Sequence, residues 1–333
     1  MFYDTGNASS QASGNHIEDK DVTIAFIGGW GRSGSTLLSR MLAEVPGFIA
    51  VGELRDVFLR GTIQDRVCGC GRRFSECDFW QSVGEEAYGG WDKLSIPRIQ
   101  ELRRRTDKPW HLPALLNPGL RKRTDQAVLE YGELFQPLYR SIRRITGARV
   151  IVDSSKIASY AAILQRTPGL SPRMVHLVRD PRGTLNSWMK QVRMKDDLDT
   201  TRYMPRYNVV TGAARYMAYN VEMHMVAKHS PRVHLRYEDL VADPASRLRE
   251  VLSIMGAEND LDVSTLIGPA GVRLGASHTV AGNPMRHESG WVELRPDEAW
   301  RTTLPVRQQQ LICALTLPLM KKYGYPAGLP NRA

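Results

Sequence analysis

A glycine-rich turn near the start of the chain carries one cation and three hydroxyl side chains. Residues 29–38 read Gly-Trp-Gly-Arg-Ser-Gly-Ser-Thr-Leu-Leu. Glycines let the backbone approach an anion, and the N–H groups at a helix start point toward it. These residue types and this spacing predict an anion-binding loop. The residues that we expect to face the anion are Gly31, Arg32, Ser33, Gly34, Ser35 and Thr36.

The elements on either side of the turn support this interpretation. Ile24 to Ile27 form a short apolar run that is typical of a buried strand. After the turn, Leu37, Leu38 and Met41 recur at helical spacing, which predicts a helix over residues 35–45. A strand, a glycine turn and a helix start together form the usual scaffold of a phosphate site.

The anion itself is not fixed by the turn alone. Gly29 and Gly34 have the spacing of a P-loop, but Ser35 stands where a Walker loop has the lysine that binds nucleotide phosphates. An ATP-dependent small-molecule kinase therefore stays open as an alternative. An ordinary glycine-rich turn with a solvated Arg32 is a second alternative.

Composition limits the class of protein. The chain has 333 residues, of which 42% are hydrophobic and 24% charged, as in a globular protein with a large core. We find no apolar run of the roughly 18 residues that a membrane span needs. Residues 1–20 are polar and lack the apolar centre of a secretion signal, so we expect a disordered tail on a cytoplasmic protein. The net charge is +10, but the basic residues are not interleaved with aromatic ones, and we predict no nucleic-acid partner.

Three of the four cysteines lie close together as Cys68, Cys70 and Cys77. A zinc site normally has four ligands, and no nearby cysteine or histidine completes the set. Two interpretations stay open: a local structural hairpin, which we favour, or a metal site that a distant residue completes.

Polar residues follow two further predicted strands. Glu53 comes just after the apolar run Phe48–Val51, and Lys156 comes after the run Arg149–Asp153. Ligands of α/β sheets bind at the carboxyl ends of strands, so both are placed for chemistry. Two structural roles compete. Glu53 could simply favour a helix start, and Ser154 or Ser155 could cap a helix over residues 157–165.

A second motif lies in residues 174–189, where an apolar strand ends at Arg179 and Pro181 suits the first turn of a helix. Ser187 follows two helical turns later, and an arginine with a hydroxyl can bind a phosphate together. A plain ion pair between Arg179 and Asp180 is the competing interpretation.

These motifs resemble those of sulfotransferases that use 3′-phosphoadenosine-5′-phosphosulfate (PAPS). The glycine turn resembles their 5′-phosphosulfate loop, and Arg179 with Ser187 resembles their 3′-phosphate motif. The segment Tyr-Glu-Asp-Leu from Tyr237 is similar to a junction near the adenine. Residues 278–286 resemble a loop of bacterial members that closes on the nucleotide, which implicates Asn283 and Arg286. Arg32 stands where animal cytosolic members have lysine, as in the carbohydrate and tyrosylprotein branches.

The resemblance implies transfer of a sulfuryl group from PAPS to a hydroxyl or amine, without a metal. Arg32, the loop and Lys156 would stabilise charge on the transferred group and the leaving phosphate. Glu53 would be the general base, with the region Asp153–Lys156 as the alternative. The acceptor is a small molecule or glycan that the sequence leaves unidentified, and the oligomeric state is likewise open.

The implied fold is α/β: a P-loop-type, three-layer fold with a central, mostly parallel sheet flanked by helices. We expect a single domain over residues 21–333. Irregular, proline-rich stretches predict a helical cap over the site, formed by residues 66–146 and 194–230.

Overall fold

The structure, a computed structural model, describes residues 21–117, 119–120, 125–194, 203–258, 260 and 263–328. The predicted tail at residues 1–20 lies outside them. A five-stranded sheet forms the centre, with strand order β2-β3-β1-β4-β5 and every neighbouring pair parallel. Its strands are β1 (Val22–Gly28), β2 (Phe48–Gly52), β3 (Val150–Lys156), β4 (Leu170–Val178) and β5 (Arg232–Arg236).

The central strands are buried on both faces, which is why their sequences are almost continuously apolar. In β1, Ile24 and Phe26 join one core cluster, whereas Ala25 and Ile27 join another on the opposite face. This alternation follows from the two-residue period of a strand. The sheet therefore needs a layer of helices on each side.

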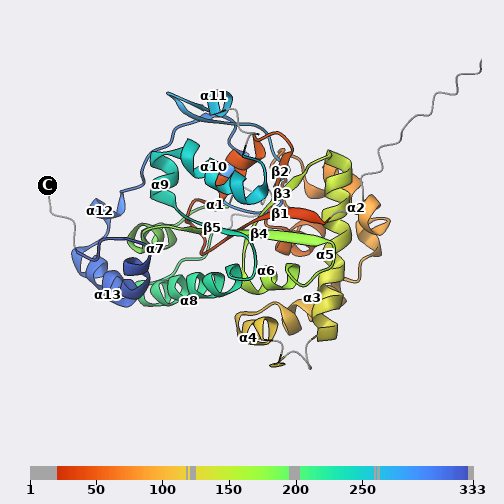
Figure 1. Ribbon diagram of the computed structural model, residues 1–333, viewed down its shortest axis with the longest axis horizontal. Coiled ribbons are helices and arrows are strands. Elements are labelled where there is room, and N and C mark those ends of the chain that lie inside the picture. The colour runs from red at the N-terminus through yellow and green to blue at the C-terminus, as the bar shows by residue number, and fades with distance from the viewer. Residues whose placement is uncertain are drawn as a thin grey trace, which may run out of the picture.

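Figure 1 shows these two helical layers on opposite faces of the sheet. One layer packs on β1, β3 and β4, and the other packs on all five strands. The first comprises α5 (Asp125–Thr146), α6 (Ala158–Leu164) and α8 (Val209–Ala227). The second comprises α1 (Ser35–Ala43), α9 (Tyr237–Ala242) and α10 (Pro244–Met255). The predicted α/β, three-layer fold class is confirmed.

The predicted helical cap is wrong for two of its helices. Both α5 and α8 pack directly against the sheet, and their buried apolar residues join the core cluster on that face. Shorter helices from the predicted cap form an outer layer, in which α2 and α3 pack on α5 and α4 packs on α6. These are α2 (Asp78–Tyr88), α3 (Ile96–Thr106) and α4 (Leu112–Leu116).

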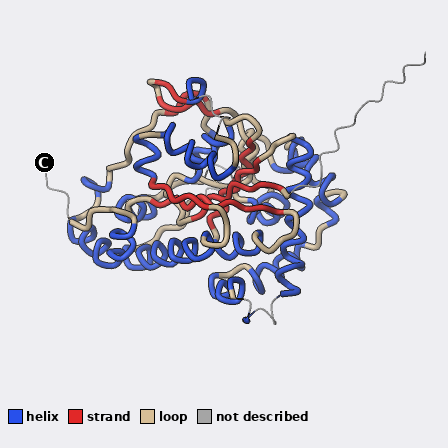
Figure 2. Tube along the Cα trace, in the orientation of Figure 1, coloured by secondary structure: helices blue, strands red, loops and turns tan. Residues whose placement is uncertain are grey.

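The remaining elements lie toward the end of the chain. Helices α7 (Pro181–Met189), α12 (Trp300–Thr303) and α13 (Val306–Lys322) pack together beside α8. Apart from the central sheet, Figure 2 shows a small antiparallel sheet near α11 (Val263–Leu266). Its strands are β6 (Ile267–Gly268), β7 (Gly271–Leu274) and β8 (Gly290–Val292).

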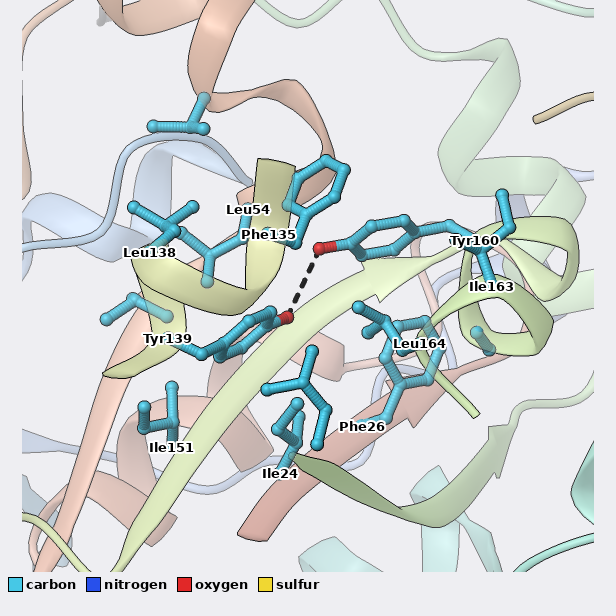
Figure 3. Close-up of a cluster of buried hydrophobic side chains, with 14 of the residues drawn as sticks. Ile24, Phe26, Leu54, Phe135, Leu138, Tyr139, Ile151, Tyr160, Ile163 and Leu164 are labelled. Carbon is cyan, nitrogen blue, oxygen red and sulfur yellow. Dashed lines mark hydrogen bonds between the residues drawn. The ribbon is translucent and has the colours of Figure 1, made fainter. Parts of the chain in front are cut away.

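The core between α5 and the sheet contains a short polar chain (Figure 3). The hydroxyls of Tyr139 and Tyr160 lie 3.2 Å apart. Tyr139 also donates a hydrogen bond to the carboxylate of Asp153, in the middle of β3. Phe135 and Leu138 pack beside these rings. Among the described residues, no helix is both long and apolar enough to cross a membrane.

Candidate active site

The loop after β1 has the backbone that its glycines predict. Gly29, Arg32 and Gly34 all have positive φ, at 123°, 70° and 90°. A Cβ on Gly29 would lie 2.4 Å from the carbonyl oxygen of Leu177, and one on Gly34 would lie 2.5 Å from the ring of Tyr237. The loop thus lies against its neighbours at distances that a larger residue would not allow.

Replacing Gly34 with alanine should lower the free energy of unfolding by roughly 2–4 kcal/mol, because the left-handed backbone and the Tyr237 contact both oppose a Cβ. Gly256→Ala is the matched control: its φ is 67°, but no atom lies within 4 Å of the added Cβ. We expect that control to lose only about 1 kcal/mol. Equal losses in urea titrations of the two variants would contradict the predicted contact.

The carboxyl ends of the five strands border a cavity of about 650 Å³. The loop after β1 forms one part of its wall, and α1 begins there at Ser35 with no acidic residue in its first turn. Most of the predicted site residues line this cavity. They are Gly31, Arg32, Gly34, Ser35, Thr36, Glu53, Lys156, Arg179, Ser187, Tyr237 and Asn283.

At the β4 and β5 side of the cavity, the predicted phosphate residues lie together. Nε of Arg32 donates to Oγ of Ser187 at 2.9 Å, and Nη1 of Arg179 donates to the carbonyl oxygen of Arg32 at 3.2 Å. The Arg179 guanidinium lies over the Tyr237 ring, 4.7 Å from its centre. Burial, and next the charge of Arg179, lower the pKa of Arg32. Two cations that repel each other, one buried and one half-buried, favour a bound anion.

Asp297 supplies a counter-ion to this cluster. Its Oδ2 lies 2.7 Å from Nη2 of Arg179, and it also lines the cavity. Burial alone would raise the pKa of Asp297, but the hydrogen bond and charge of Arg179 lower it overall. Sequence analysis missed Asp297, because it lies in a stretch with no motif.

Trp188 is a second residue that the sequence motifs did not single out. Its indole Nε1 donates to the carbonyl oxygen of Gly31 at 2.9 Å, and its ring stacks on Trp30 with centres 5.3 Å apart. Trp188 directly follows Ser187 in the predicted helix, and this position is the sequence signal from which its role could have been predicted. Trp188 fixes the loop from the α7 side and lines the cavity.

At the β2 and β3 side of the cavity, a carboxylate meets an ammonium. Oε1 of Glu53 lies 2.5 Å from Nζ of Lys156, which also donates to the carbonyl oxygen of Ser154 at 2.8 Å. Strand register brings these side chains close together, since Gly52, the last residue of β2, pairs with Asp153 of β3, and β3 then continues to Lys156. Lys156 has a φ of 68°, an uncommon conformation for a non-glycine residue that often marks a functional site.

Asp153, part of the alternative catalytic region, faces the core instead of the cavity. It accepts hydrogen bonds from Tyr139 and from the backbone N–H of Ser155, the latter at 2.8 Å. Burial raises its pKa to about 6. The predicted cap role of Ser154 or Ser155 is also wrong: both residues belong to β3, and the N-cap residue of α6 is Ile157. Lys156 is the member of this region that reaches the cavity.

Two other predicted residues lie outside the cavity wall. Ser33 is buried within the loop. Arg286 is 1% exposed, and its guanidinium donates to the carbonyl oxygens of Thr279 and Val67. Its charge is therefore used to join two chain segments, and the structure does not bring it to the predicted phosphate site. Asn283 does line the cavity, and its backbone N–H lies 3.5 Å from Oγ1 of Thr36.

Beyond Glu53, the cavity wall also includes the carboxylate of Asp56 and a set of cationic and aromatic residues that the sequence motifs did not indicate. These are Arg55, Arg60, Tyr207, Arg215 and Tyr219. Arg55 is anchored by Asp107, with Nε and Oδ2 at 2.5 Å. Two tryptophans from the segment expected to form the cap are not among the lining residues: Trp80 is fully buried, and Trp110 is 71% exposed.

The cysteines do lie on a hairpin, because Val67 and Arg73 form an antiparallel bridge and the Cys68 N–H donates to the carbonyl oxygen of Arg72, and this backbone is compatible with both interpretations of the cysteines. The sequence did not place a fourth ligand beside these thiols. The structure does, since His278 lies against Cys68 and Cys77.

The fold and site together define an α/β protein with a glycine-rich loop after its first strand and a cavity rich in cations at its strand ends. A sulfotransferase family model matches residues 25–260, and the chain belongs to that family. This confirms the resemblance seen in the motifs and disfavours the kinase alternative. Carbohydrate sulfotransferase 5 of Mus musculus is 31% identical over a 179-residue alignment that covers 46% of this chain. The match spans 42% of that relative's length.

Two solved structures resemble the chain along most of its length. The sulfotransferase domain from the Synechococcus PCC 7002 olefin synthase is 21% identical, with a TM-score of 0.48, and the match covers 92% of this chain and 96% of that one. The sulfotransferase domain from the curacin biosynthetic pathway is 16% identical, with a TM-score of 0.48, and the corresponding shares are 93% and 99%.

Proposed function

We propose that the protein transfers a sulfuryl group from PAPS to an acceptor hydroxyl. The observation that carries the proposal is the order of groups along the strand ends. From β2 to β5 they are the Glu53 carboxylate, the Lys156 ammonium, the anion-binding loop, Arg179 and Tyr237. This order matches a ligand with one phosphate at the loop, a second phosphate at Arg179 and a reacting group beside Glu53.

The 3′-phosphate would bind at the Arg32, Arg179 and Ser187 cluster. Two guanidiniums and a hydroxyl give a dianion charge-assisted hydrogen bonds, and ATP has no phosphate at that position of the ribose. We had expected Arg32 to act on the transferred group. Its hydrogen bond to Ser187 instead supports a role at the 3′-phosphate. Tyr237, which lies under Arg179, is placed to contact the nucleoside.

The 5′-phosphosulfate would bind at the loop and the first turn of α1. The Ser35 and Thr36 amides have no intrahelical partner at a helix start, and the helix dipole favours an anion there. Lys156 belongs to the strand beside β1 and pairs in register with Gly28. We propose that it stabilises charge on the leaving phosphate oxygen.

In the proposed reaction, the acceptor oxygen bonds to sulfur as the bond from sulfur to the 5′-phosphate oxygen breaks. Glu53 takes the proton of the acceptor hydroxyl, and 3′,5′-adenosine bisphosphate leaves. In the structure, Oε1 of Glu53 lies 2.5 Å from Nζ of Lys156. Donor binding would move the ammonium toward the phosphate and free the carboxylate to act as base.

We further propose a carbohydrate-type acceptor. The part of the cavity beyond Glu53 offers tyrosine rings, suited to sugar faces, and arginines, suited to polar or acidic substituents. The mouse relative is by name a carbohydrate sulfotransferase, which supports the same class of acceptor.

Asp297→Asn should strengthen binding of 3′,5′-adenosine bisphosphate by about 3- to 10-fold, because its carboxylate competes with the 3′-phosphate for Arg179. Glu298→Gln is the control, since its exposed carboxylate pairs with Arg301 and does not line the cavity. Calorimetric titration of both variants measures the effect. Weaker binding by the Asp297 variant would show that the carboxylate supports the site.

The proposed activity can be tested with PAPS carrying a labelled sulfuryl group and a panel of mono- and oligosaccharides. We expect labelled ester and an equal amount of 3′,5′-adenosine bisphosphate with at least one sugar. Binding of the bisphosphate without transfer to any sugar would overturn the acceptor class. Phosphoryl transfer from ATP to the same panel would overturn the reaction itself.

A further inference from the structure

Three cysteines and one histidine from distant parts of the chain lie together, away from the residues that line the cavity. Cys68, Cys70 and Cys77 come from the hairpin before α2, and His278 lies 201 residues beyond Cys77. All four ligand atoms lie within 4.8 Å of one another. Cys68 and Cys77 are buried, whereas Cys70 and His278 are partly exposed.

The distances within the cluster fit a tetrahedral metal centre. Sγ of Cys77 lies 3.7 Å from Sγ of Cys70 and 3.8 Å from Sγ of Cys68. Nδ1 of His278 lies 3.4 Å from Sγ of Cys77 and 3.8 Å from Sγ of Cys68. Zinc–sulfur bonds of about 2.3 Å in tetrahedral geometry place adjacent sulfurs roughly 3.8 Å apart. The thiols are free, and their separations are far beyond a disulfide bond of about 2.05 Å.

The surroundings of the four side chains hold them in orientation. The Cys77 sulfur accepts a backbone hydrogen bond from Trp80, and the Cys68 sulfur accepts one from Cys70. The ring of Phe79 stacks on His278 with centres 4.6 Å apart, and Trp80 Nε1 donates to the carbonyl oxygen of His278 at 3.0 Å. Partners of this kind fix ligands in metal sites.

The two segments that supply the cluster are also joined by their backbones. The Gly69 N–H donates to the carbonyl oxygen of Thr279 at 3.0 Å, and a Cβ on Gly69 would lie 2.6 Å from the carbonyl oxygen of Ser277. Arg286 bonds the carbonyl oxygens of Val67 and Thr279. The buried arginine that we had expected at a phosphate therefore holds the cysteine hairpin against the segment that carries His278.

We propose that Cys68, Cys70, Cys77 and His278 bind one Zn²⁺ ion. Three sulfurs and one imidazole nitrogen in tetrahedral geometry match the preference of zinc. Four protein ligands leave no open position, so the ion is structural. Its role is to hold the segment after His278 in place. That segment lies beside β2, where the Val280 N–H donates to the carbonyl oxygen of Val51 at 3.2 Å, and it brings Asn283 to the cavity. The proposal does not depend on the donor or acceptor of the reaction.

The test is the metal content of the full chain, produced with zinc in the medium and purified under reducing conditions without chelator. Elemental analysis by mass spectrometry should find one zinc per chain in the wild type. Cys77→Ser should lose the zinc, and Cys313→Ser, which removes a buried thiol outside the cluster, should keep it. A different metal at one per chain, or no metal with all thiols free or paired in a disulfide, would overturn the proposal.

A second measurement uses the wild-type protein, so that the test still holds if the Cys77 variant does not fold. Removing the metal from the wild type and adding Co²⁺ should give the absorption bands of tetrahedral cobalt with thiolate ligands, one equivalent at saturation. Chelation should also lower the Tm of the wild type by roughly 5 °C or more, with recovery on adding zinc. Octahedral cobalt spectra, or a Tm indifferent to chelator and zinc, would contradict a structural site.

Discussion

Replacing Arg179 with alanine is expected to weaken binding of 3′,5′-adenosine bisphosphate by about 30- to 1,000-fold, or roughly 2–4 kcal/mol. The guanidinium is almost buried, 6% exposed, and it lies with Arg32 and Ser187 where we propose the 3′-phosphate binds. AMP has no such phosphate, so its affinity should change little. Calorimetric titration of wild type and variant with both nucleotides gives the comparison.

Arg301→Ala is the matched control for this prediction. It removes a cation near the same end of the site, but its guanidinium pairs with Glu298 and does not line the cavity. Bisphosphate affinity should stay close to that of the wild type. An equal loss of AMP and bisphosphate binding by Arg179→Ala would mean that the residue acts on the fold of the site and does not select the 3′-phosphate.

Glu53→Gln is expected to lower kcat by about 10²- to 10⁴-fold, the usual contribution of a general base. The amide cannot take the proton of the acceptor, although its oxygen can still accept the hydrogen bond of Lys156. Donor affinity should therefore stay within a few-fold of the wild type. The readouts are the rate of labelled ester formation with an accepted sugar and a calorimetric titration of the bisphosphate.

Glu133→Gln provides the control for this second prediction. Glu133 is an exposed carboxylate of α5 that does not line the cavity, so its rate should match the wild type. Glu53→Gln with an unchanged kcat would sink the assignment of Glu53 as base. The Lys156 ammonium would then be the group to test next, because it is the other charged residue of the pair.

The strand ends could be predicted from the sequence because the physics there is local. An apolar run that stops at glycines or at Arg179, followed by a helical pattern, fixes both the strand and the end that carries the site. Parallel strands have their carboxyl ends at one edge, so residues after different strands converge. The residues after β1 to β5 accordingly meet at one cavity.

Contacts that depend on packing between distant segments could not be predicted in this way. Arg286 was expected at a phosphate because residues 278–286 resemble a loop that closes on the nucleotide. Two carbonyl groups from segments far apart in the sequence instead hold its guanidinium in the interior. His278 reaches the cysteine hairpin through the same packing. The helices α5 and α8 were expected in a cap, and nothing in an amphipathic pattern says which surface a helix will cover.

The central claim is that the cavity selects a nucleotide with both a 5′- and a 3′-phosphate. The most direct test is calorimetric titration of the wild-type protein with 3′,5′-adenosine bisphosphate, AMP and ATP with Mg²⁺ under one set of conditions. We predict that the bisphosphate binds at least tenfold more tightly than AMP or ATP with Mg²⁺, because only its 3′-phosphate makes charge-assisted contacts with Arg32 and Arg179. Tighter binding of ATP with Mg²⁺, or equal affinity for AMP and the bisphosphate, would contradict the account.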